Sequence, residues 1–527
     1  DAVAKAGEQI AALRDETEKN IGPEEAEIFD AHLMMLEDPD FVEGMTNEIA
    51  DESVCAEFAC MVNCENFQAM FRAMDDEYMQ ARAADIGDIS MRVLKNLKGI
   101  AENPLDTITE PCIVVANDLT PSDTAKMGGK PVVGFITKIG GRTSHSAIMA
   151  RSMGIPAVVG AGEKLDPIED GMELLIDGAA GELTAQPDEE TLVQFAEKKA
   201  KDDERRAMLA EFRDRPGETS DGRRIIIEGN IGTPGDAVRV MELGGEGVGL
   251  FRSEFLFMDR PDLPSEEEQF QAYKKAVETM DGRPVIIRTL DIGGDKEVPA
   301  LDLEKEQNPF LGYRAIRICL NRTDLFLVQL RALLRAAQYG DLRIMFPMIS
   351  SVDELRNAKQ VLREAMDLLD AEGVDYNPNV KVGIMVEIPV AAVCADVLAQ
   401  EADFFSIGTN DLIQYSCAVD RINEKISYLY RPLHPGVLRL IAMTAKAAGE
   451  NGIECGVCGE MAGTPGMASV LCGLGVTNLS MSASAMPAAK ADLAAHSYAE
   501  CRELAQRLLK TASAEDAENI FAEWRGE

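Results

Sequence analysis

The chain has 527 residues, too many for a single hydrophobic core, so we expect two to four domains. Hydrophobic residues make up 46% and charged residues 27%, as in an ordinary globular protein, and no run of eighteen apolar residues predicts a membrane span. The formal net charge of −39 argues against nucleic-acid binding, because few cations remain to neutralise phosphates. Eleven cysteines without a signal peptide indicate reduced thiols and a cytoplasmic protein.

Residues 1–103 have a helical pattern, as in IFDAHLMMLED and YMQARAADIGDISMRVLKNL, which predicts a bundle of amphipathic helices. The chain starts without Met, in residues that are already helical in pattern, so we expect a truncated amino terminus. Its first 50 residues hold 14 acidic and 3 basic side chains, enough to present an acidic face to a basic partner. Charge alone leaves equally open that this acidity only serves solubility.

Residues 104–187 change to short β-rich runs separated by Gly and Pro, namely PCIVVAND, KPVVGFIT, IPAVVG and MELLIDG. This pattern predicts a small α/β domain. Residues 188–217 form a charge-dense helical segment that ends at Pro216 and Gly217, which predicts a linker helix.

Residues 218–527 alternate strand-like apolar runs with longer helical stretches. The runs are RRIIIEGNI, GVGLFR, PVIIRTLD, LRIMFPMI, VKVGIMVEIP, DFFSIGTND, IECGVCGE and NLSMSAS. Eight such runs predict a (β/α)₈ TIM barrel, so the fold class is a multidomain α/β protein. Polar residues fall at or just past the carboxyl ends of the runs: Arg252, Arg288, Glu387, Asn410, Asp411 and Cys458. In such barrels that end holds the active site.

The residue types at this end indicate a site for an anion and a metal. Four arginines can offer paired donors to a carboxylate or a phosphate. They are Arg252, Arg288, Arg314 and Arg421. Glu387 and Asp411 form a carboxylate pair that suits Mg²⁺ when water and substrate oxygens complete its shell. Cys455 and Cys458 form a C-x-x-C, but zinc would need two more ligands, and none is suitably spaced.

His145 lies in GGRTSHSAIMARSMGIPAVVG, after a strand-like run and before a helical stretch. The glycines permit a tight turn, Ser and Thr can cap the helix, and the N–H groups at the helix start favour a phosphate. A neutral imidazole, with an ordinary pKa of about 6.5, is a competent nucleophile toward phosphorus. On local chemistry alone, a histidine that merely caps the helix is the alternative.

Two long motifs resemble a known family. GGRTSHSAIMAR, residues 140–151, is similar to the phosphohistidine signature of the phosphoenolpyruvate-utilising enzymes, and DFFSIGTNDLIQYSCAVDR, residues 403–421, resembles their second signature. FRSEFLFMDR, RTLDIGGDK and NPFLGYRAIR are also similar to family segments, so the resemblance covers essentially the whole chain. Within the family it points to the enzyme I group of the sugar phosphotransferase system.

The resemblance implies that the phosphoryl group of phosphoenolpyruvate moves through His145 to a small carrier protein, HPr, in the first step of sugar uptake. It implies that Thr143 helps to hold the ring or the phosphate and that Cys458 protonates the enolate. It implies that Glu387 and Asp411 bind Mg²⁺. Residues implied to bind phosphoenolpyruvate or to lie alongside it are Arg252, Arg288, Asn410, Asp411, Arg421, Lys296 and Arg314.

The resemblance also implies partners and movement. Residues 1–103 become the HPr-binding subdomain, residues 104–187 the phosphohistidine domain, and the barrel domain the site of homodimerisation. Candidate docking residues are His32, Glu24, Glu25 and Glu27, although a solvated acidic face remains the alternative for each. Because His145 must serve both the barrel and the carrier, we expect its domain to swing about residues 188–217.

Other functions stay open. Pyruvate-phosphate dikinases and phosphoenolpyruvate synthases share the histidine loop and the barrel, but they carry a long ATP-binding region ahead of it, and only 144 residues precede His145. A regulatory protein that senses phosphoenolpyruvate through an inactive barrel is disfavoured by the intact Cys458, Glu387 and Asp411. An enzyme I of the nitrogen-regulatory branch would carry an additional amino-terminal sensory domain.

Overall fold

The computed structural model divides the chain into two compact units, residues 1–201 and 202–527. The residues that it describes are 2–20, 23–72, 77–98, 105, 108–119, 123, 127, 130–140, 155–178, 180–258, 260, 262–294, 298–301, 303–304, 306–421, 423 and 425–526. Each unit has its own core and is described by itself.

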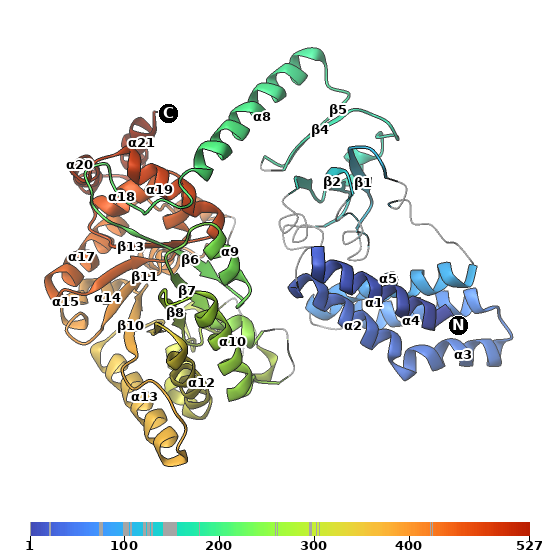
Figure 1. Cartoon of the computed structure of the whole chain (residues 1–527), viewed down its shortest axis with the longest axis horizontal. Coiled ribbons are helices and arrows are strands. Elements are labelled where there is room, and N and C mark those ends of the chain that lie inside the picture. Colours follow the sequence, from blue (N-terminus) through green and yellow to red (C-terminus); the bar gives the residue numbers. More distant parts are fainter. Residues whose placement is uncertain are drawn as a thin grey trace. The chain divides into compact units, whose positions relative to one another are not determined.

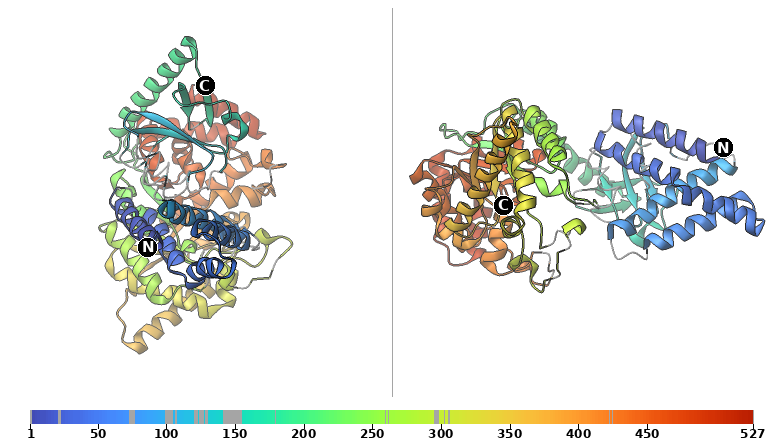
Figure 2. Two further views of the ribbon diagram at one scale, coloured as in Figure 1. Left: turned by 90° about the vertical axis from the view of Figure 1, so that its right-hand side faces the viewer. Right: turned by 90° about the horizontal axis from the view of Figure 1, so that it is seen from below.

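Five helices form the first part of the first unit: α1 (Ala2–Asn20), α2 (Pro23–Glu37), α3 (Pro39–Glu52), α4 (Ala56–Arg72) and α5 (Glu77–Lys98). Pro23 and Pro39 begin α2 and α3, where a proline costs no helical hydrogen bond. α1 packs against α2 and α5, and α4 packs against α3 and α5. These helices form the blue part of the chain in Figure 2. Ile10, Phe29 and Phe41 lie in the shared core, which confirms the predicted helical bundle.

A small β region completes the first unit. β1 (Cys112–Ala116), β2 (Val132–Thr137) and β3 (Ala157–Val158) pair in parallel, and β4 (Leu174–Asp177) pairs antiparallel with β5 (Glu182–Ala185). The first four strands coincide with the four predicted runs, whereas β5 was missed because ELTA is short and largely exposed. The predicted charge-dense helix is α8 (Glu189–Ala210), and the boundary between the units falls inside it (Figure 1). The finer domain limits stay predictions.

Eight parallel strands close the barrel of the second unit (Figure 1). They are β6 (Ile226–Ile231), β7 (Val248–Arg252), β8 (Val285–Arg288), β9 (Leu342–Phe346), β10 (Lys381–Val386), β11 (Phe404–Ile407), β12 (Glu454–Val457) and β13 (Asn478–Met481). Each strand lies within one of the eight predicted runs, which confirms the predicted barrel. Because the strands are parallel, their carboxyl ends meet at one end of the barrel.

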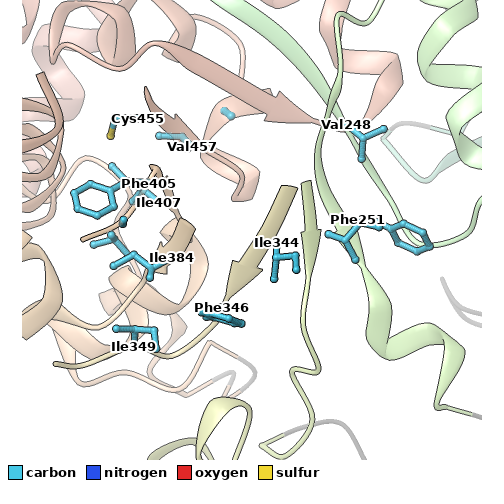
Figure 3. Packing of buried hydrophobic residues seen from close by; sticks show 14 of the residues in the cluster. Val248, Phe251, Ile344, Phe346, Ile349, Ile384, Phe405, Ile407, Cys455 and Val457 are labelled. Carbon is cyan, nitrogen blue, oxygen red and sulfur yellow. The ribbon is translucent and has the colours of Figure 1, made fainter. Parts of the chain in front are cut away.

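The barrel strands contribute apolar residues to two cores. An inner cluster takes one residue from each of five neighbouring strands together with Cys458: Leu250, Ile286, Met345, Met385 and Phe404. Their sequence neighbours belong to a much larger outer cluster, among them Phe251, Ile344, Ile384 and Phe405 (Figure 3). Since side chains alternate between the faces of a strand, the inner cluster fills the barrel and the outer cluster joins the strands to the helices.

The helices of the second unit are α9 (Asp236–Glu242), α10 (Glu266–Thr279), α11 (Ile316–Asn321), α12 (Thr323–Ala336), α13 (Val352–Glu372), α14 (Pro389–Val393), α15 (Ala395–Leu398), α16 (Thr409–Cys417), α17 (Pro435–Asn451), α18 (Met467–Gly473), α19 (Met486–Ala495), α20 (Tyr498–Leu509) and α21 (Ala514–Arg525). Local signals set their limits. Ser265 and Glu268 form a capping box at the start of α10, and Gly373 in a left-handed conformation ends α13. Among the described residues, no helix has the length and apolar character to cross a membrane.

Candidate active site

The polar residues predicted from the strand ends lie together at the carboxyl-terminal end of the barrel. They are Arg252 at the end of β7, Arg288 at the end of β8, Glu387 just after β10, Asn410 and Asp411 in the first turn of α16 after β11, and Cys458 just after β12. Parallel strands carry all of these positions to one end. The fold therefore brings these residues into one region although they span more than 200 positions of the sequence.

Two of the predicted arginines are buried among carboxylates. Arg288 Nη2 donates a hydrogen bond to Glu254, and its Nη1 lies 2.8 Å from Oδ2 of Asp291. Arg314 Nη2 donates to Oδ1 of the same Asp291 at 2.9 Å, and its Nη1 donates to the Tyr415 hydroxyl at 3.0 Å. Burial opposes the charge of both guanidinium groups, but Asp291 and the other nearby carboxylates outweigh it and raise the pKa of each. Both arginines are therefore firmly cationic.

The predicted metal ligands, Glu387 and Asp411, are both buried. Glu387 Oε1 accepts a hydrogen bond of 2.7 Å from the backbone N–H of Met348, a residue with a left-handed φ of 56°. Burial raises the pKa of Glu387, and the negative charges of Asp411 and Asp291 raise it further. Asp411 Oδ2 lies 3.5 Å from Arg314 Nη2, while its Oδ1 accepts no hydrogen bond from the described residues.

This carboxylate pair fits a divalent cation. A buried oxygen that accepts no hydrogen bond, as Asp411 Oδ1 is, costs free energy unless a cation binds it. The repulsion that raises the pKa of Glu387 would also be relieved by a shared cation. Glu387 and Asp411 would supply two of the ligands; within the described part of the chain no group of three or more His, Cys, Asp or Glu side chains could hold a metal. A hard cation can take the others from water and substrate.

Cys458 lies in the inner cluster of the barrel, almost completely buried. Burial raises the pKa of its thiol to about 11, although a hydrogen bond with Ser406 and the charge of Arg288 act in the opposite direction. The thiol is therefore protonated at neutral pH and can serve as a proton donor. Cys455, the other cysteine of the C-x-x-C, belongs to the outer cluster and only packs (Figure 3).

A pocket of about 540 Å³ opens at the same end of the barrel, with Arg252 and Glu460 in its lining. Asn410 contacts this lining, since its Oδ1 accepts a hydrogen bond of 3.2 Å from the backbone N–H of Glu460. Asn230, another lining residue, donates to the carbonyl of Cys458 at 2.9 Å. The pocket is therefore lined by a predicted anion-binding arginine and lies next to the backbone of Cys458.

The remaining predicted residues divide into two groups. Arg421 belongs to the cluster, because its Nη1 lies 4.0 Å from Oδ1 of Asp411. His145, Thr143 and Lys296 lie outside the described residues, so their roles stay predictions.

His32 does not fit the docking role predicted for it. Its side chain is completely buried in the helical bundle, with Nε2 3.5 Å from Asp85 and Nδ1 3.9 Å from Asp88. A side chain inside the bundle cannot contact a carrier directly, so His32 is corrected to a core residue. The prediction came from the family resemblance of the whole segment, which does not tell which side chains of α2 face the core; Met34 of the same helix is exposed. The side chains of Glu24, Glu25 and Glu27 lie outside the described part of the structure.

Four residues of this region were not predicted from the sequence: Glu254, Asp291, Met348 and Tyr415. Glu254 and Asp291 follow shortly after the arginines that end β7 and β8, so their position past a strand end was an available signal. Tyr415 lies one helical turn after Asp411, on the same side of α16. Met348 acts through its backbone, and no side-chain pattern could have indicated it.

Comparison with known proteins places the chain in a family. Residues 206–498 match the model of the PEP-utilising enzyme, PEP-binding domain, residues 108–181 match the mobile domain, and residues 1–82 match the N-terminal domain. Phosphoenolpyruvate-protein phosphotransferase of Priestia megaterium is 49% identical over 515 residues, which cover 98% of this chain and 90% of that protein. The protein of the same name from Bacillus subtilis (strain 168) is 47% identical over 516 residues, with 98% and 90% covered.

Among solved structures, the NMR solution structure of Enzyme I (nEIt) is 40% identical to the aligned part, which covers 38% of this chain and 82% of that chain, with a TM-score of 0.34. The family models and the two relatives together account for both units of the molecule. This chain belongs to the family of PEP-utilising enzymes.

Proposed function

We propose that this chain is an enzyme that transfers the phosphoryl group of phosphoenolpyruvate through His145 to a small phosphocarrier protein, HPr, and releases pyruvate. One observation carries the proposal: two cationic guanidinium groups, a buried carboxylate pair and a protonated thiol meet at one end of the barrel. Two relatives named phosphoenolpyruvate-protein phosphotransferase, which match 98% of the chain, support it.

The chemistry of the substrate accounts for these groups. Phosphoenolpyruvate carries a carboxylate and a phosphate, and Arg252, Arg288 and Arg421 bind these anions. The His145 imidazole attacks phosphorus while the enolate of pyruvate leaves in line. Cys458 then gives its thiol proton to the methylene carbon of the enolate, which forms pyruvate, and the thiolate recovers a proton from water. Protonation of the enolate makes the overall transfer favourable.

We assign Mg²⁺ to the carboxylate pair. Glu387 and Asp411 supply oxygen ligands, and the unsatisfied Oδ1 of Asp411 supports a cation there. When bound, Mg²⁺ would neutralise part of the charge on the phosphoryl oxygens. The protein's own residues hold this position rigidly, since Met348 fixes one oxygen of Glu387.

The carrier and the assembly are further parts of the proposal. The excess of acidic side chains in residues 1–50 supports docking of a basic surface, with Glu24, Glu25 and Glu27 as candidate contacts. A homodimer through the barrel unit follows from the family resemblance alone. Sedimentation equilibrium of the whole chain tests it, and a monomer at all concentrations would exclude the homodimer.

Transfer of ³²P tests the function directly. Wild-type protein mixed with labelled phosphoenolpyruvate and Mg²⁺ should become labelled and should pass the label to purified HPr. His145→Ala should do neither, because the chain would lack the nucleophile. His434→Ala is the matched control: this histidine caps α17 through its Nδ1, which accepts from the Gly436 N–H at 3.1 Å, and its loss should leave the labelling intact.

Two further experiments distinguish this function from the alternative functions. Removal of Mg²⁺ with a chelator, or Glu387→Gln, should abolish labelling from phosphoenolpyruvate. ATP or AMP should have no effect on the exchange. A requirement for either nucleotide would point to dikinase-type chemistry, and labelling of His145→Ala would refute the proposed route.

A further inference from the structure

We propose that Asp291 is a positioning residue that joins Arg288 and Arg314 into one two-pronged receptor for the substrate anion. This inference rests on the proposed function. It assigns a role to a carboxylate that, in that function, neither contacts the substrate nor binds the metal.

The geometry of Asp291 is that of a bridge. Its Oδ2 lies 2.8 Å from Arg288 Nη1, and its Oδ1 accepts a hydrogen bond of 2.9 Å from Arg314 Nη2. Each oxygen therefore binds a different guanidinium group. Asp291 is 1% exposed, Arg314 2% and Arg288 6%, so water does not mediate or screen these contacts.

Two buried cations cannot lie close together without a negative charge between them. In a site of low polarity the repulsion between guanidinium groups is strong, and an uncompensated buried charge is costly. A carboxylate that binds both groups removes the repulsion and fixes the distance between them. Asp291 therefore determines whether a single small anion can reach Arg288 and Arg314 at the same time.

The remaining hydrogen-bond donors show what this bridge leaves available. The other terminal nitrogen of Arg288 donates to Glu254, and the other terminal nitrogen of Arg314 donates to Tyr415. The Nε atoms of both arginines are buried and have no hydrogen-bond partner among the described residues. Each Nη atom thus has a protein partner, while the Nε–H of each guanidinium stays unsatisfied.

The backbone beneath Asp291 is also fixed. The N–H of Leu290 donates to Gln329 Oε1 at 2.9 Å, and Gln329 Nε2 donates to Ser253 Oγ at 3.0 Å. Ser253 Oγ in turn donates to the carbonyl of Arg288 at 2.6 Å. This buried chain of hydrogen bonds links the ends of β7 and β8 to α12. The position of Asp291 is therefore set by the fold before any substrate binds.

Asp291→Asn tests the role of the bridging charge. The variant keeps the shape of the side chain but loses its charge, so the two arginines should move apart. The KM for phosphoenolpyruvate in the labelling reaction should rise at least tenfold. The rate at which the protein, once phosphorylated, passes its label to HPr should stay unchanged, because that step does not use the barrel site. A general loss of structure would impair both steps.

Asp341→Asn is the matched control. Asp341 also pairs with a barrel arginine, Arg343, at 2.8 Å, but at the amino-terminal end of β9. Its loss should leave the KM for phosphoenolpyruvate within a factor of two of wild type. A rise equal to that of Asp291→Asn would mean that any broken barrel ion pair has this effect, and the inference would fail.

Asp291→Glu tests whether the position of the carboxylate matters in addition to its charge. It also replaces Asp291→Asn as the test variant if Asp291→Asn does not fold. It keeps the negative charge but displaces it by one methylene, so the KM should again rise several-fold. A normal KM in Asp291→Glu would show that only the charge matters, and an unchanged or lower KM in folded Asp291→Asn would show that Asp291 does not position the arginines. Absence of labelling in the wild-type protein would instead refute the proposed function itself.

Discussion

Single side chains set the charge balance of the barrel site. Four carboxylates and two guanidinium groups are buried together: Glu254, Asp291, Glu387, Asp411, Arg288 and Arg314. If all six are ionised, this group carries a net charge of −2, which repels an anionic substrate. A divalent cation brings the sum to zero, and the arginines of the site can then attract the substrate. We therefore expect phosphoenolpyruvate to bind more tightly when Mg²⁺ is already present.

Cys458→Ala should lower the rate of pyruvate formation by about 10²–10⁴-fold, because the barrel loses the thiol that donates the proton. Pyruvate formed in the presence of HPr and Mg²⁺ is the measurement. Cys455→Ala removes an equally buried thiol from the outer cluster and should retain turnover. Comparable losses in the two variants would show that packing, and not the proton of Cys458, is responsible.

Some of these side chains could be predicted from the sequence and others could not. Arg252, Glu387 and Cys458 stand at strand ends, and in a parallel barrel that placement alone brings them together. The role of Asp291 could not be predicted, because it depends on which side chains the arginines contact, and the sequence pattern does not give those contacts. The error at His32 has a different origin, because the family resemblance assigns a docking role to a whole segment but not to particular side chains of it.

Two loop elements beside the site hold unfavourable backbone conformations. Ala315 has φ 53° at the start of α11, directly after Arg314, and Met348 has φ 56° where its N–H binds Glu387. A left-handed φ in a residue other than glycine costs about 1–3 kcal/mol. The strain therefore occurs where a loop must direct a guanidinium or a backbone N–H toward the site.

Ala315→Gly should raise the free energy of unfolding of the barrel unit by about 1 kcal/mol, because glycine adopts this φ without strain. Urea unfolding followed by the fluorescence of Trp524, the only tryptophan of the chain, reports on this unit. Ala332→Gly, inside α12, should instead lower it by about 1 kcal/mol. Destabilisation by both replacements would argue that Ala315 is not strained.

β6 contains a buried acid at a structural position. Burial raises the pKa of Glu228 to about 7, while its Oε1 accepts only a long hydrogen bond of 3.4 Å from Asn478. Between about pH 4.5 and 7 the unfolded chain loses a proton that the folded chain keeps, so this residue makes stability fall as pH rises. Above pH 7 the loss amounts to on the order of 3 kcal/mol.

Glu228→Gln should remove the decrease in stability that Glu228 causes as the pH rises. The difference in the free energy of unfolding between pH 5 and pH 8, measured with Trp524 fluorescence, should become smaller in the variant than in wild type. Glu242→Gln is the control, since Glu242 is an exposed acid of the same unit that pairs with Arg239 at 3.0 Å. Equal pH profiles for wild type and Glu228→Gln would exclude Glu228 as the cause.

At the scale of the whole molecule, two compact units share a single helix. The boundary falls inside α8, whose 22 residues are largely charged and exposed. His145 lies between β2 and β3 in the sequence, whereas the barrel site belongs to the other unit. If the phosphoryl group passes between them, the units must change their relative position during each cycle.

Small-angle scattering should detect this change. Addition of phosphoenolpyruvate and Mg²⁺ to the wild-type protein should alter the scattering profile, because phosphoryl transfer requires His145 to meet the barrel site. His145→Ala, which can bind the substrate but cannot accept the phosphoryl group, separates binding from transfer. Superimposable wild-type profiles with and without the substrate would contradict the predicted swing.

The eight strands and the amino-terminal helices were predictable because their apolar patterns are long and regular. Each barrel strand reads as an apolar run, as expected when both faces are buried. β5 has no such run and was missed. Composition indicated a linker helix at residues 188–217 but not that the boundary between the units falls inside α8.

The separation of the barrel's inner and outer clusters has a consequence for how the enzyme tolerates mutation. Along β9, Met345 faces the interior that also holds Cys458, whereas Ile344 and Phe346 face the helices. Saturation mutagenesis of this strand should therefore affect protein abundance and catalytic activity in two different patterns. Protein abundance should suffer at every position, while catalytic output per folded molecule should drop only at alternate ones. If the residues inside the barrel contributed only to stability, the activity per folded molecule would not alternate from one position to the next.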